Sequence, residues 1–540
     1  MPFNVNPVIC KISSRFAKCC LSLTPASFVA ILALVFVAPP SAHAHVGSPD
    51  VYAEGNAGPY KLFITVRPPQ VIPGVAEIEL RAEGAGSDAP AISSILITPI
   101  PLTGEASHHP PVPDQMKQSA QDKQYFTGAL WIMASGSWQV RFIVNGNQGQ
   151  GVLSIPVPAT ASSTRGMQAG LGIVLGSLGL LLVAGVVGIV GAAVRDAQLP
   201  PGVQAPASSR KRAWIGMAVA LVVTIAAVWL GNRWWKSEAS DYAQYVYKPL
   251  TMQAVLGPNQ ILKLKLTDPG WRKSRKLDDF VLDHDHLMHL YLIRQPGFDV
   301  VYHLHPDQIA PGEFQLALPS IPAGTYSLYA DVVHATGFPE TLVAQMTLPD
   351  VTGRPLAGDD AKGLAQALTS PSSCPANPVT GPSFRLPDGY TMVWNNPATL
   401  PAKTPQVFTF SLLGIDGKPA QDTALYMGML GHAAFVKDDG TVFAHVHPSG
   451  TVSMAALMMA AAQNQASQTS QPNSGAMASM SGMAMPASTT SSTVLPNSAG
   501  FPYGFPTAGA YRIFVQMKHG PTIETAAFDA CAAAPLASTP

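Results

Sequence analysis

Two long apolar runs without a charged residue constrain the fold of this chain more than any other feature. The first run covers residues 169–194 and the second covers residues 213–231. Each run is long enough to cross the hydrocarbon core of a bilayer, which takes about 20 helical residues. Two buried helices of a soluble protein are the alternative, but such helices rarely stay free of charged residues over this length. The sequence therefore predicts two transmembrane helices.

The loop between the two runs, residues 195–212, predicts how the chain crosses the membrane. It carries four basic residues and a single acidic one, Asp196. By the positive-inside rule such a loop stays in the cytoplasm. The flanking parts then lie outside, and we expect an inner (plasma) membrane protein with most of its chain in the periplasm. The spacing Gly172-x-x-x-Gly176 would let helices pack closely, within the chain or in a homodimer.

Residues 1–44 have the organisation of a secretory signal peptide. A basic stretch precedes an apolar run at 26–37, and Ala42 and Ala44 fit the small-x-small cleavage rule. Cleavage after Ala44 would make His45 the first residue of the mature chain. An uncleaved membrane anchor is the alternative interpretation.

Composition excludes some classes of function. Charged residues make up 12% of the chain, against about 25% in an average soluble protein. The 32 basic residues balance the 32 acidic ones, so the chain lacks the basic excess of a nucleic-acid-binding protein. We therefore expect no nucleic-acid partner.

Short segments of alternating apolar and polar residues, separated by Gly, Pro and Asn, fill most of the remaining chain. This pattern is typical of β-sandwich domains. We predict a mainly β fold with three exported β-sandwich (Ig-like) domains, and with the two transmembrane helices between the first and the second. The predicted segments are sandwiches at 45–165, 245–350 and 386–532, a linker at 351–385, and a low-complexity insert at 454–500 within the third sandwich.

The second and third sandwiches look like repeats of one another. In each, a histidine precedes a His-x-His-Pro element, and a further histidine follows a tyrosine by eight residues. The four histidines are His289, His303, His305 and His334 in the second sandwich, and His432, His445, His447 and His519 in the third.

A hairpin gives the repeated histidines a geometry. If the turn is centred on the Gln295–Phe298 stretch, His289 lies directly across from His303, and His305 shares their face. The opposite face is apolar and would form the core. The third sandwich would place His432 across from His445 in the same way.

Three or four neutral imidazoles suit Cu(II), Zn(II) or Ni(II), whereas Ca(II) and Mg(II) prefer carboxylates. We therefore predict that the eight repeated histidines are metal ligands. The alternative is that they are ordinary polar residues at strand ends. The tract Asp283-His284-Asp285-His286 adds donors nearby. In a regular strand its histidines would face away from His289, so we treat them as accessory.

The insert at 454–500 contributes a second kind of metal donor. Four of its methionines are closely spaced, at Met477, Met480, Met483 and Met485. Thioethers are soft ligands that select Cu(I). The alternative is a low-complexity linker that happens to contain methionine. Soft donors beside imidazoles in an exported chain favour copper, with zinc as the second choice.

Two further features depend on export. After cleavage, His45 could chelate Cu(II) with its imidazole and its free α-amino group, completed by His108 or His109. Two cysteines, Cys374 and Cys531, would remain in the mature chain, in an oxidising compartment. We predict a disulfide between them, with a free thiol or a Cu(I) ligand as the alternative.

The start His45-Val-Gly-Ser-Pro resembles that of the CopC-type periplasmic copper carriers, whose mature chains also begin with histidine. The repeated His…His-x-His-Pro blocks at 280–335 and 430–520 resemble extracytoplasmic sandwich modules of the YtkA-like class, which occur beside metal-handling proteins. Both resemblances imply metal binding.

Motifs of common enzymes are missing from the sequence, which has no phosphate-binding loop, no nucleophile elbow and no His-Glu-x-x-His. We therefore expect a non-enzymatic, membrane-anchored copper-binding protein, for copper tolerance or for delivery to a periplasmic copper-handling partner. The alternatives are a structural or interaction protein with incidental histidines and a copper redox enzyme.

Overall fold

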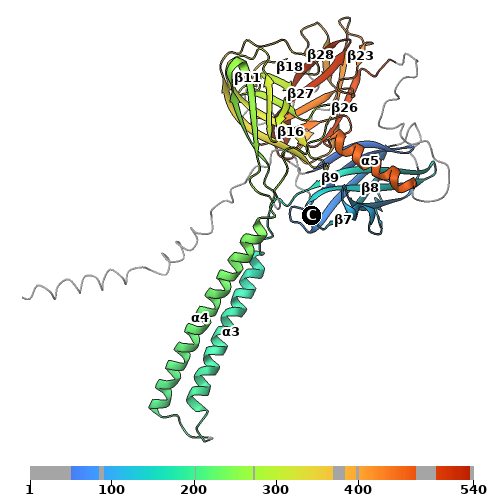
Figure 1. Ribbon diagram of the computed structural model, residues 1–540. Coiled ribbons are helices and arrows are strands. Elements are labelled where there is room, and N and C mark those ends of the chain that lie inside the picture. Colours follow the sequence, from blue (N-terminus) through green and yellow to red (C-terminus); the bar gives the residue numbers. More distant parts are fainter. Residues whose placement is uncertain are drawn as a thin grey trace, which may run out of the picture. The chain divides into compact units, whose positions relative to one another are not determined.

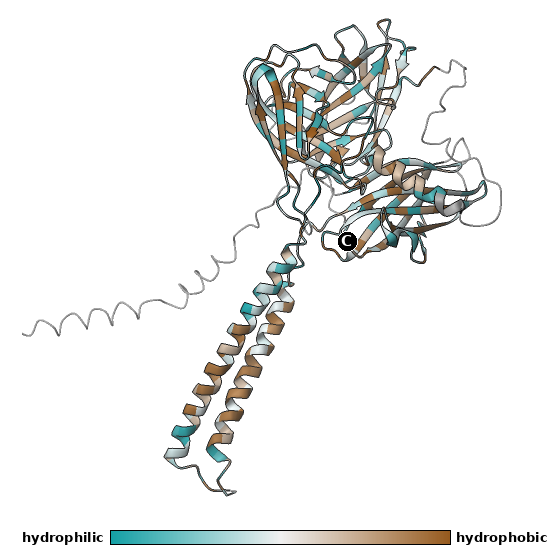
Figure 2. Ribbon diagram, viewed as in Figure 1, coloured by the Kyte–Doolittle hydropathy of each residue, from teal (hydrophilic) through white to brown (hydrophobic). Residues whose placement is uncertain are grey.

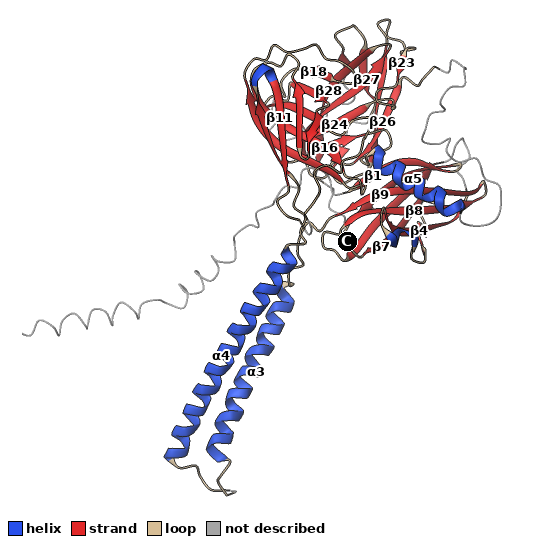
Figure 3. Ribbon diagram, viewed as in Figure 1, coloured by secondary structure: helices blue, strands red, loops and turns tan. Residues whose placement is uncertain are grey.

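The computed structural model describes residues 50–83, 91–200, 202–271, 274–368, 383–396, 400–469 and 494–534. All of them belong to one compact unit, residues 46–540. Strands dominate these ranges and form six sheets, accompanied by two long helices (Figures 1 and 3). The mainly β fold is thus confirmed. The predicted signal peptide and His45 lie outside the described residues.

The N-terminal β segment, residues 50–161, contains two sheets. The first has the order β1 (Val51–Ala57), β2 (Tyr60–Arg67), β3 (Gly74–Glu83), β7 (Tyr125–Ile132) and β6 (Lys117–Gln118). The second has the order β5 (Asp114–Gln115), β4 (Ile92–Pro101), β8 (Gly136–Gly146) and β9 (Gly149–Ala159), with the short helix η2 (Glu105–His108) after β4. Alternate residues of both sheets, such as Ile64 and Ile155, share one buried core.

Two helices, α3 (Ala169–Asp196) and α4 (Ala207–Ala243), follow the N-terminal β segment. Both are long and apolar enough to cross a membrane, and Figure 2 shows that hydrophobic residues make up most of each ribbon. They approach closely where a Cβ on Gly191 would come within 2.6 Å of the Met217 sulfur. The helix α4 extends beyond the predicted run because hydropathy marks only the part suited to the bilayer core.

The middle β segment, residues 251–364, contains two further sheets. The first has the order β10 (Thr251–Leu256), β11 (Ile261–Thr267), β15 (Glu313–Ala317) and β14 (Asp307–Ala310), with η3 (Pro258–Gln260) before β11. The second has the order β17 (Pro339–Leu348), β16 (Gly324–Val333), β12 (His289–Gln295), β13 (Val300–Leu304) and β18 (Ala361–Leu364). The strand β18 lies in the predicted linker, where its backbone pairs with the free edge of β13.

The C-terminal β segment, residues 383–534, repeats this plan. One sheet has the order β19 (Ser383–Arg385), β20 (Thr391–Trp394), β22 (Gln406–Leu413) and β26 (Ser498–Tyr503). The other has the order β21 (Leu400–Pro401), β28 (Thr522–Ala533), β27 (Gly509–His519), β24 (His432–Lys437) and β25 (Phe443–Val446), with β23 (Thr423–Ala424) also paired to β27. Cys531 in β28 is disulfide-bonded. Cys374 lies outside the described residues, so the predicted Cys374–Cys531 pairing stays a prediction.

The start of the predicted insert is helical rather than irregular. The helix α5 (Met454–Thr469) is rich in alanine and methionine, which are strong helix formers. Three of its residues, Ala456, Leu457 and Ala460, join the core of the N-terminal β segment. The four methionines predicted as Cu(I) ligands, Met477, Met480, Met483 and Met485, lie outside the described residues.

The sheets that carry the repeated histidines face one another. A fourth apolar cluster joins Tyr291 and Tyr329 of the middle β segment to Phe443 and Phe514 of the C-terminal one. The rings of Tyr329 and Phe443 stack with centroids 4.2 Å apart. Both faces of the central strands β12, β13 and β24 are therefore buried, which the sequence analysis did not predict.

Candidate metal centre

The hairpin of β12 and β13 keeps the predicted faces but has a different register. Tyr291 pairs with His303, so the predicted pairing of His289 with His303 is wrong by two residues. The register differs because the turn between the two strands extends to Asp299, where an ion pair between Asp299 and Arg294 closes it. A shift of two residues keeps every side chain on its face. His289 and His303 therefore still lie together.

The hairpin of β24 and β25 shows the same shift. His445 pairs with Ala434 rather than with His432. Here Gly440 adopts a left-handed φ of 70° in the turn, and Lys437 closes it through a backbone bond to Val442. The predicted apolar core face of the first hairpin is confirmed, because its residues belong to the core of the middle β segment. These residues are Met288, Leu290, Leu292, Val300, Tyr302 and Leu304.

In the middle β segment, two histidine nitrogens face each other without a proton to share. The Nε2–H of His289 donates to the backbone carbonyl of Asp283 at 3.0 Å. The Nδ1–H of His303 donates to the side-chain oxygen of Gln516 at 2.9 Å. These partners assign the tautomers, so His289 Nδ1 and His303 Nε2 both carry lone pairs. The two atoms are only 3.1 Å apart.

His305 completes this group, which we call the middle triad (His289, His303 and His305). One nitrogen from each ring lies within 4.8 Å of the others. The Nδ1 of His305 is 3.1 Å from the carboxylate of Asp360, and its Nε2 is buried without a hydrogen-bond partner. Three imidazole lone pairs thus converge, as the sequence analysis predicted for these residues.

A second group, the C-terminal triad, consists of His284, His432 and His447. Their nitrogens also lie within 4.8 Å of one another. The Nε2 atoms of all three are buried and have no hydrogen-bond partner. Buried polar atoms are nearly always satisfied, so three unsatisfied nitrogens at one place need an explanation.

The other nitrogens of the C-terminal triad are occupied. The Nδ1–H of His284 donates to the carbonyl of Met427 at 2.8 Å, and that of His447 donates to the carbonyl of Val452 at 3.3 Å. Such bonds fix the ring and its tautomer, as they do for histidines that bind metals. The free Nε2 lone pairs are therefore held in place.

Side chains cross between the two β segments in a reciprocal way. Gln516 of the C-terminal segment holds His303 of the middle segment. In return, Asp331 of the middle segment lies 3.3 Å from the Nδ1 of His445. The Nε2 of His445 is 3.1 Å from the Nδ1 of His432. His445, predicted as a ligand, thus contacts His432, and His284 is the third histidine of the C-terminal triad.

The two triads adjoin within one histidine cluster. Ring centroids are 6.0 Å apart for His284 and His289, and 6.3 Å apart for His303 and His432. His286 stacks on His305 at 3.8 Å. The cluster comprises His284, His286, His289, His303, His305, His432, His445 and His447.

Burial favours the uncharged form of the inner histidines of the cluster. It lowers the pKa of His289 to about 4 and that of His447 to about 3. Burial, reinforced by neighbouring imidazoles, also lowers the pKa values of His303, His432 and His445 well below the usual range. At neutral pH these rings therefore present lone pairs rather than positive charges, the state that metal binding requires.

This burial predicts how the metal-free chain responds to acid. The histidines have folded pKa values below the unfolded value of about 6.5, so the unfolded state binds more protons below that pH. With EDTA present, we expect the free energy of unfolding to fall from pH 6.5 towards pH 4, where His289 begins to titrate. The loss is about 1.4 kcal/mol per imidazole and pH unit, and it is partly offset by Asp331 and Asp360, whose pKa values burial raises to about 7 and about 6. Denaturant unfolding at pH 7, 6 and 5 measures it, and a flat profile would contradict the assignment.

The structure separates two predicted ligands from the cluster. Both ring nitrogens of His334 contact carboxylates, of Asp279 at 2.7 Å and of Glu340 at 2.9 Å. Burial opposes protonation of His334, but these two carboxylates outweigh it and raise its pKa. His519 likewise lies among carboxylates. The expectation that these two histidines complete the triads is therefore wrong: each lies three residues beyond the strand position that pairs with His289 or His432, which turns its side chain to the opposite face.

The sequence analysis missed the role of His284. It assumed a regular strand, but Asp283–His286 forms a turn in which His284 has a φ of 50°. The C-terminal segment has an equivalent turn, closed between Tyr426 and Met429. The signal was present in the sequence, since His284-x-His286 repeats the spacing of the two His-x-His-Pro elements.

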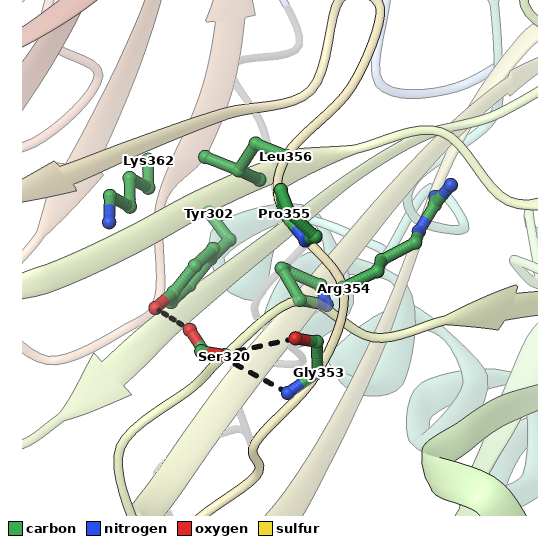
Figure 4. A pocket seen from close by; sticks show the side chains of 8 residues that line it. Tyr302, Ser320, Gly353, Arg354, Pro355, Leu356 and Lys362 are labelled. Carbon is green, nitrogen blue, oxygen red and sulfur yellow. Dashed lines mark hydrogen bonds between the residues drawn. The ribbon is translucent and has the colours of Figure 1, made fainter.

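One small pocket lies on the other side of β13, behind the cluster. Tyr302 donates a hydrogen bond of 2.7 Å to the carbonyl of Ser320 there (Figure 4). The pocket has a volume of about 220 Å³, and its lining contains no histidine. It is lined by Tyr302, Pro319, Ser320, Gly353, Arg354, Pro355, Leu356 and Lys362. We assign no chemistry to it.

Comparison with protein families gives a match in the C-terminal β segment. A family described as "Domain of unknown function (DUF8832)" matches residues 385–534, which is less than half of the chain. The matched part includes His432, His445 and His447. No curated protein matches this chain.

Solved structures give only distant likenesses. Latent PorU from Porphyromonas gingivalis is 7% identical with a TM-score of 0.13, and the match covers 90% of this chain but only 34% of PorU. The ICAM-5 D1–D4 ectodomain fragment is 8% identical (TM-score 0.15), with 88% and 78% of the two chains covered. The alpha-2-macroglobulin of E. coli is 12% identical (TM-score 0.16), with 88% and 26% covered. These scores are too low to carry an argument about function.

Proposed function

We propose that this chain is a membrane-anchored, extracytoplasmic copper-binding protein that holds two ions in the histidine cluster. The single observation that carries this proposal is the 3.1 Å separation of His289 Nδ1 and His303 Nε2, on two rings whose other nitrogens face carbonyl oxygens. Neither nitrogen has a proton to donate to the other, because the single N–H of each neutral ring already donates to an oxygen, of Asp283 or of Gln516. A metal ion bound by both nitrogens removes this repulsion. The unsatisfied Nε2 atoms of the C-terminal triad support a second ion.

The donor set fits copper. Neutral imidazoles bind Cu(II), Zn(II) and Ni(II), and Cu(II) binds most tightly in this series. The turn before His432 carries Met427 and Met429 at the positions that His284 and His286 occupy in the middle β segment. Thioethers at a histidine site favour Cu(I). Zinc is the second choice of metal.

The membrane anchor and the export signal support a role outside the cytoplasm. The helices α3 and α4 supply the anchor, and the basic loop at 195–212 favours a cytoplasmic connection between them. Both β segments that carry the cluster would then lie in the periplasm. A protein of this kind would sequester copper for tolerance or deliver it to a periplasmic copper-handling partner.

Metal titration of the full chain in detergent tests the proposal. We expect two equivalents of copper in the cluster, with Cu(I) and Cu(II) measured separately by competition with chelators of known affinity. Zinc should bind more weakly than Cu(II) at the same positions. If zinc binds more tightly than Cu(II), the metal of this site is zinc rather than copper.

A structural or interaction protein is the alternative function. The apolar contact between Tyr329 and Phe443 joins the two histidine-bearing sheets through residues that are not metal donors. If the chain binds neither copper nor zinc, the histidines are packing residues and this alternative is the better account.

A further inference from the structure

A second group of donors lies in the C-terminal β segment, outside the histidine cluster. It consists of Asp388, His519 and Glu524, whose ligand atoms lie within 4.8 Å of one another. The Nε2 of His519 is 2.7 Å from the Asp388 carboxylate. The buried Nε2 has no hydrogen-bond partner among the described residues. A short contact without a shared proton is the arrangement of two ligands around one ion.

The opposite side of the His519 ring is fixed in place. Its Nδ1 lies 3.3 Å from the carboxylate of Asp422, which also accepts a hydrogen bond of 3.1 Å from the Tyr390 hydroxyl. The Tyr390 ring stacks on the imidazole at a centroid distance of 3.9 Å. A carboxylate on one nitrogen directs the lone pair of the other towards a metal. Here that lone pair faces Asp388 and Glu524.

The middle β segment provides a comparison within the same chain. There His334 also lies between two carboxylates, but the guanidinium of Arg275 forms an ion pair with one of them, Glu340. Tyr247 donates a further hydrogen bond of 2.6 Å to Glu340. The carboxylate charge is therefore balanced by the protein itself, and this group needs no added cation.

The C-terminal group lacks such a balance. Among the described residues, no lysine or arginine forms an ion pair with Asp388, Asp422 or Glu524. Glu524 is only 8% exposed, and no hydrogen bond or ion pair to its carboxylate occurs within the described ranges. Three carboxylates thus surround one imidazole, and in the described part of the chain no lysine or arginine balances their mutual repulsion.

We propose that Asp388, His519 and Glu524 bind a divalent cation of the zinc class, at a site separate from the histidine cluster. Zn(II) commonly takes imidazole nitrogen together with carboxylate oxygen. The mixed donors are harder than the all-imidazole cluster, so this site should prefer zinc where the cluster prefers copper. Asp422 and Tyr390 would orient His519 from behind.

The test uses the full chain in detergent, with the cluster disabled by His303→Ala and His432→Ala. Calorimetric titration with Zn²⁺ alone should still show one equivalent. Adding Asp388→Asn and Glu524→Gln should remove it, or weaken it at least tenfold. Asp416→Asn, which neutralises an exposed carboxylate of the same segment, is the matched control and should change nothing.

A stability measurement separates this proposal from a protonated His519 held by its acidic neighbours. Without metal, Asp388→Asn and Glu524→Gln should raise the melting temperature, because they relieve repulsion between carboxylates. With excess Zn²⁺, only the unsubstituted site should gain stability. A lower melting temperature without metal, or zinc binding unaffected by the two substitutions, would overturn the proposal. Copper binding by an intact cluster should not respond to these substitutions. The proposal for the zinc site and the proposal for the copper cluster can therefore be refuted independently of each other.

Discussion

Replacing His303 and His432 together by alanine should remove both copper ions from the full chain. Each substitution deletes one donor from a set of three, His303 from the middle triad and His432 from the C-terminal triad. Loss of an outer-shell partner already costs about 10- to 100-fold in metal affinity, and a direct ligand should cost more. Equilibrium dialysis followed by metal analysis gives the stoichiometry, which should fall from two equivalents to none.

The control for this double variant shortens one exposed side chain in each of the two β segments. Ile309 is 51% exposed and Ile415 is 71% exposed, so Ile309→Ala with Ile415→Ala leaves the cluster untouched. This variant should retain two equivalents. If the histidine variant also retains two equivalents while it is folded, the copper ions are bound elsewhere and the cluster is not the site.

The second large effect is expected from His284→Ala, which should remove one copper ion and leave the other. His284 belongs to the middle β segment, yet its Nε2 lies with those of His432 and His447. The ion lost should therefore be the one in the C-terminal triad. In the Cu(II) electron paramagnetic resonance spectrum, the signal of one site should disappear and that of the other should persist.

Asp285→Asn is the matched control, because Asp285 is the exposed neighbour of His284 in the same turn and asparagine tolerates its left-handed φ of 68°. This variant should bind two ions. Loss of both ions in His284→Ala would show that the two triads act as one site. Retention of both ions would show that the C-terminal triad takes its third ligand from elsewhere, as the sequence analysis had assumed for His445.

Much of the cluster was predictable from local rules. Side chains alternate along a strand, so His303 and His305 had to share a face whatever the register. The register itself was not predictable, because it depends on turn contacts such as the ion pair between Arg294 and Asp299. Because the predicted register is wrong by two residues, it places His289 opposite the wrong partner but on the correct face of the sheet.

Other features could not be derived from local patterns. Nothing in the alternation of β12 shows that Tyr291 packs against Phe443 of another sheet. That contact is a tertiary one, and it brings the two triads together. His284 was missed for a similar reason, since a turn with left-handed backbone can only be distinguished from a strand by its surroundings.

Burial of the cluster has a consequence for the speed of metal exchange. His303 and His432 are completely shielded from solvent, and apolar rings close the interface beside them. The turn that holds His286, whose side chain is 26% exposed, is the more open side. An ion bound in this cluster would leave only as fast as that turn moves or the two sheets separate. Residence time, set by the opening of the protein, would then control how copper passes to a partner.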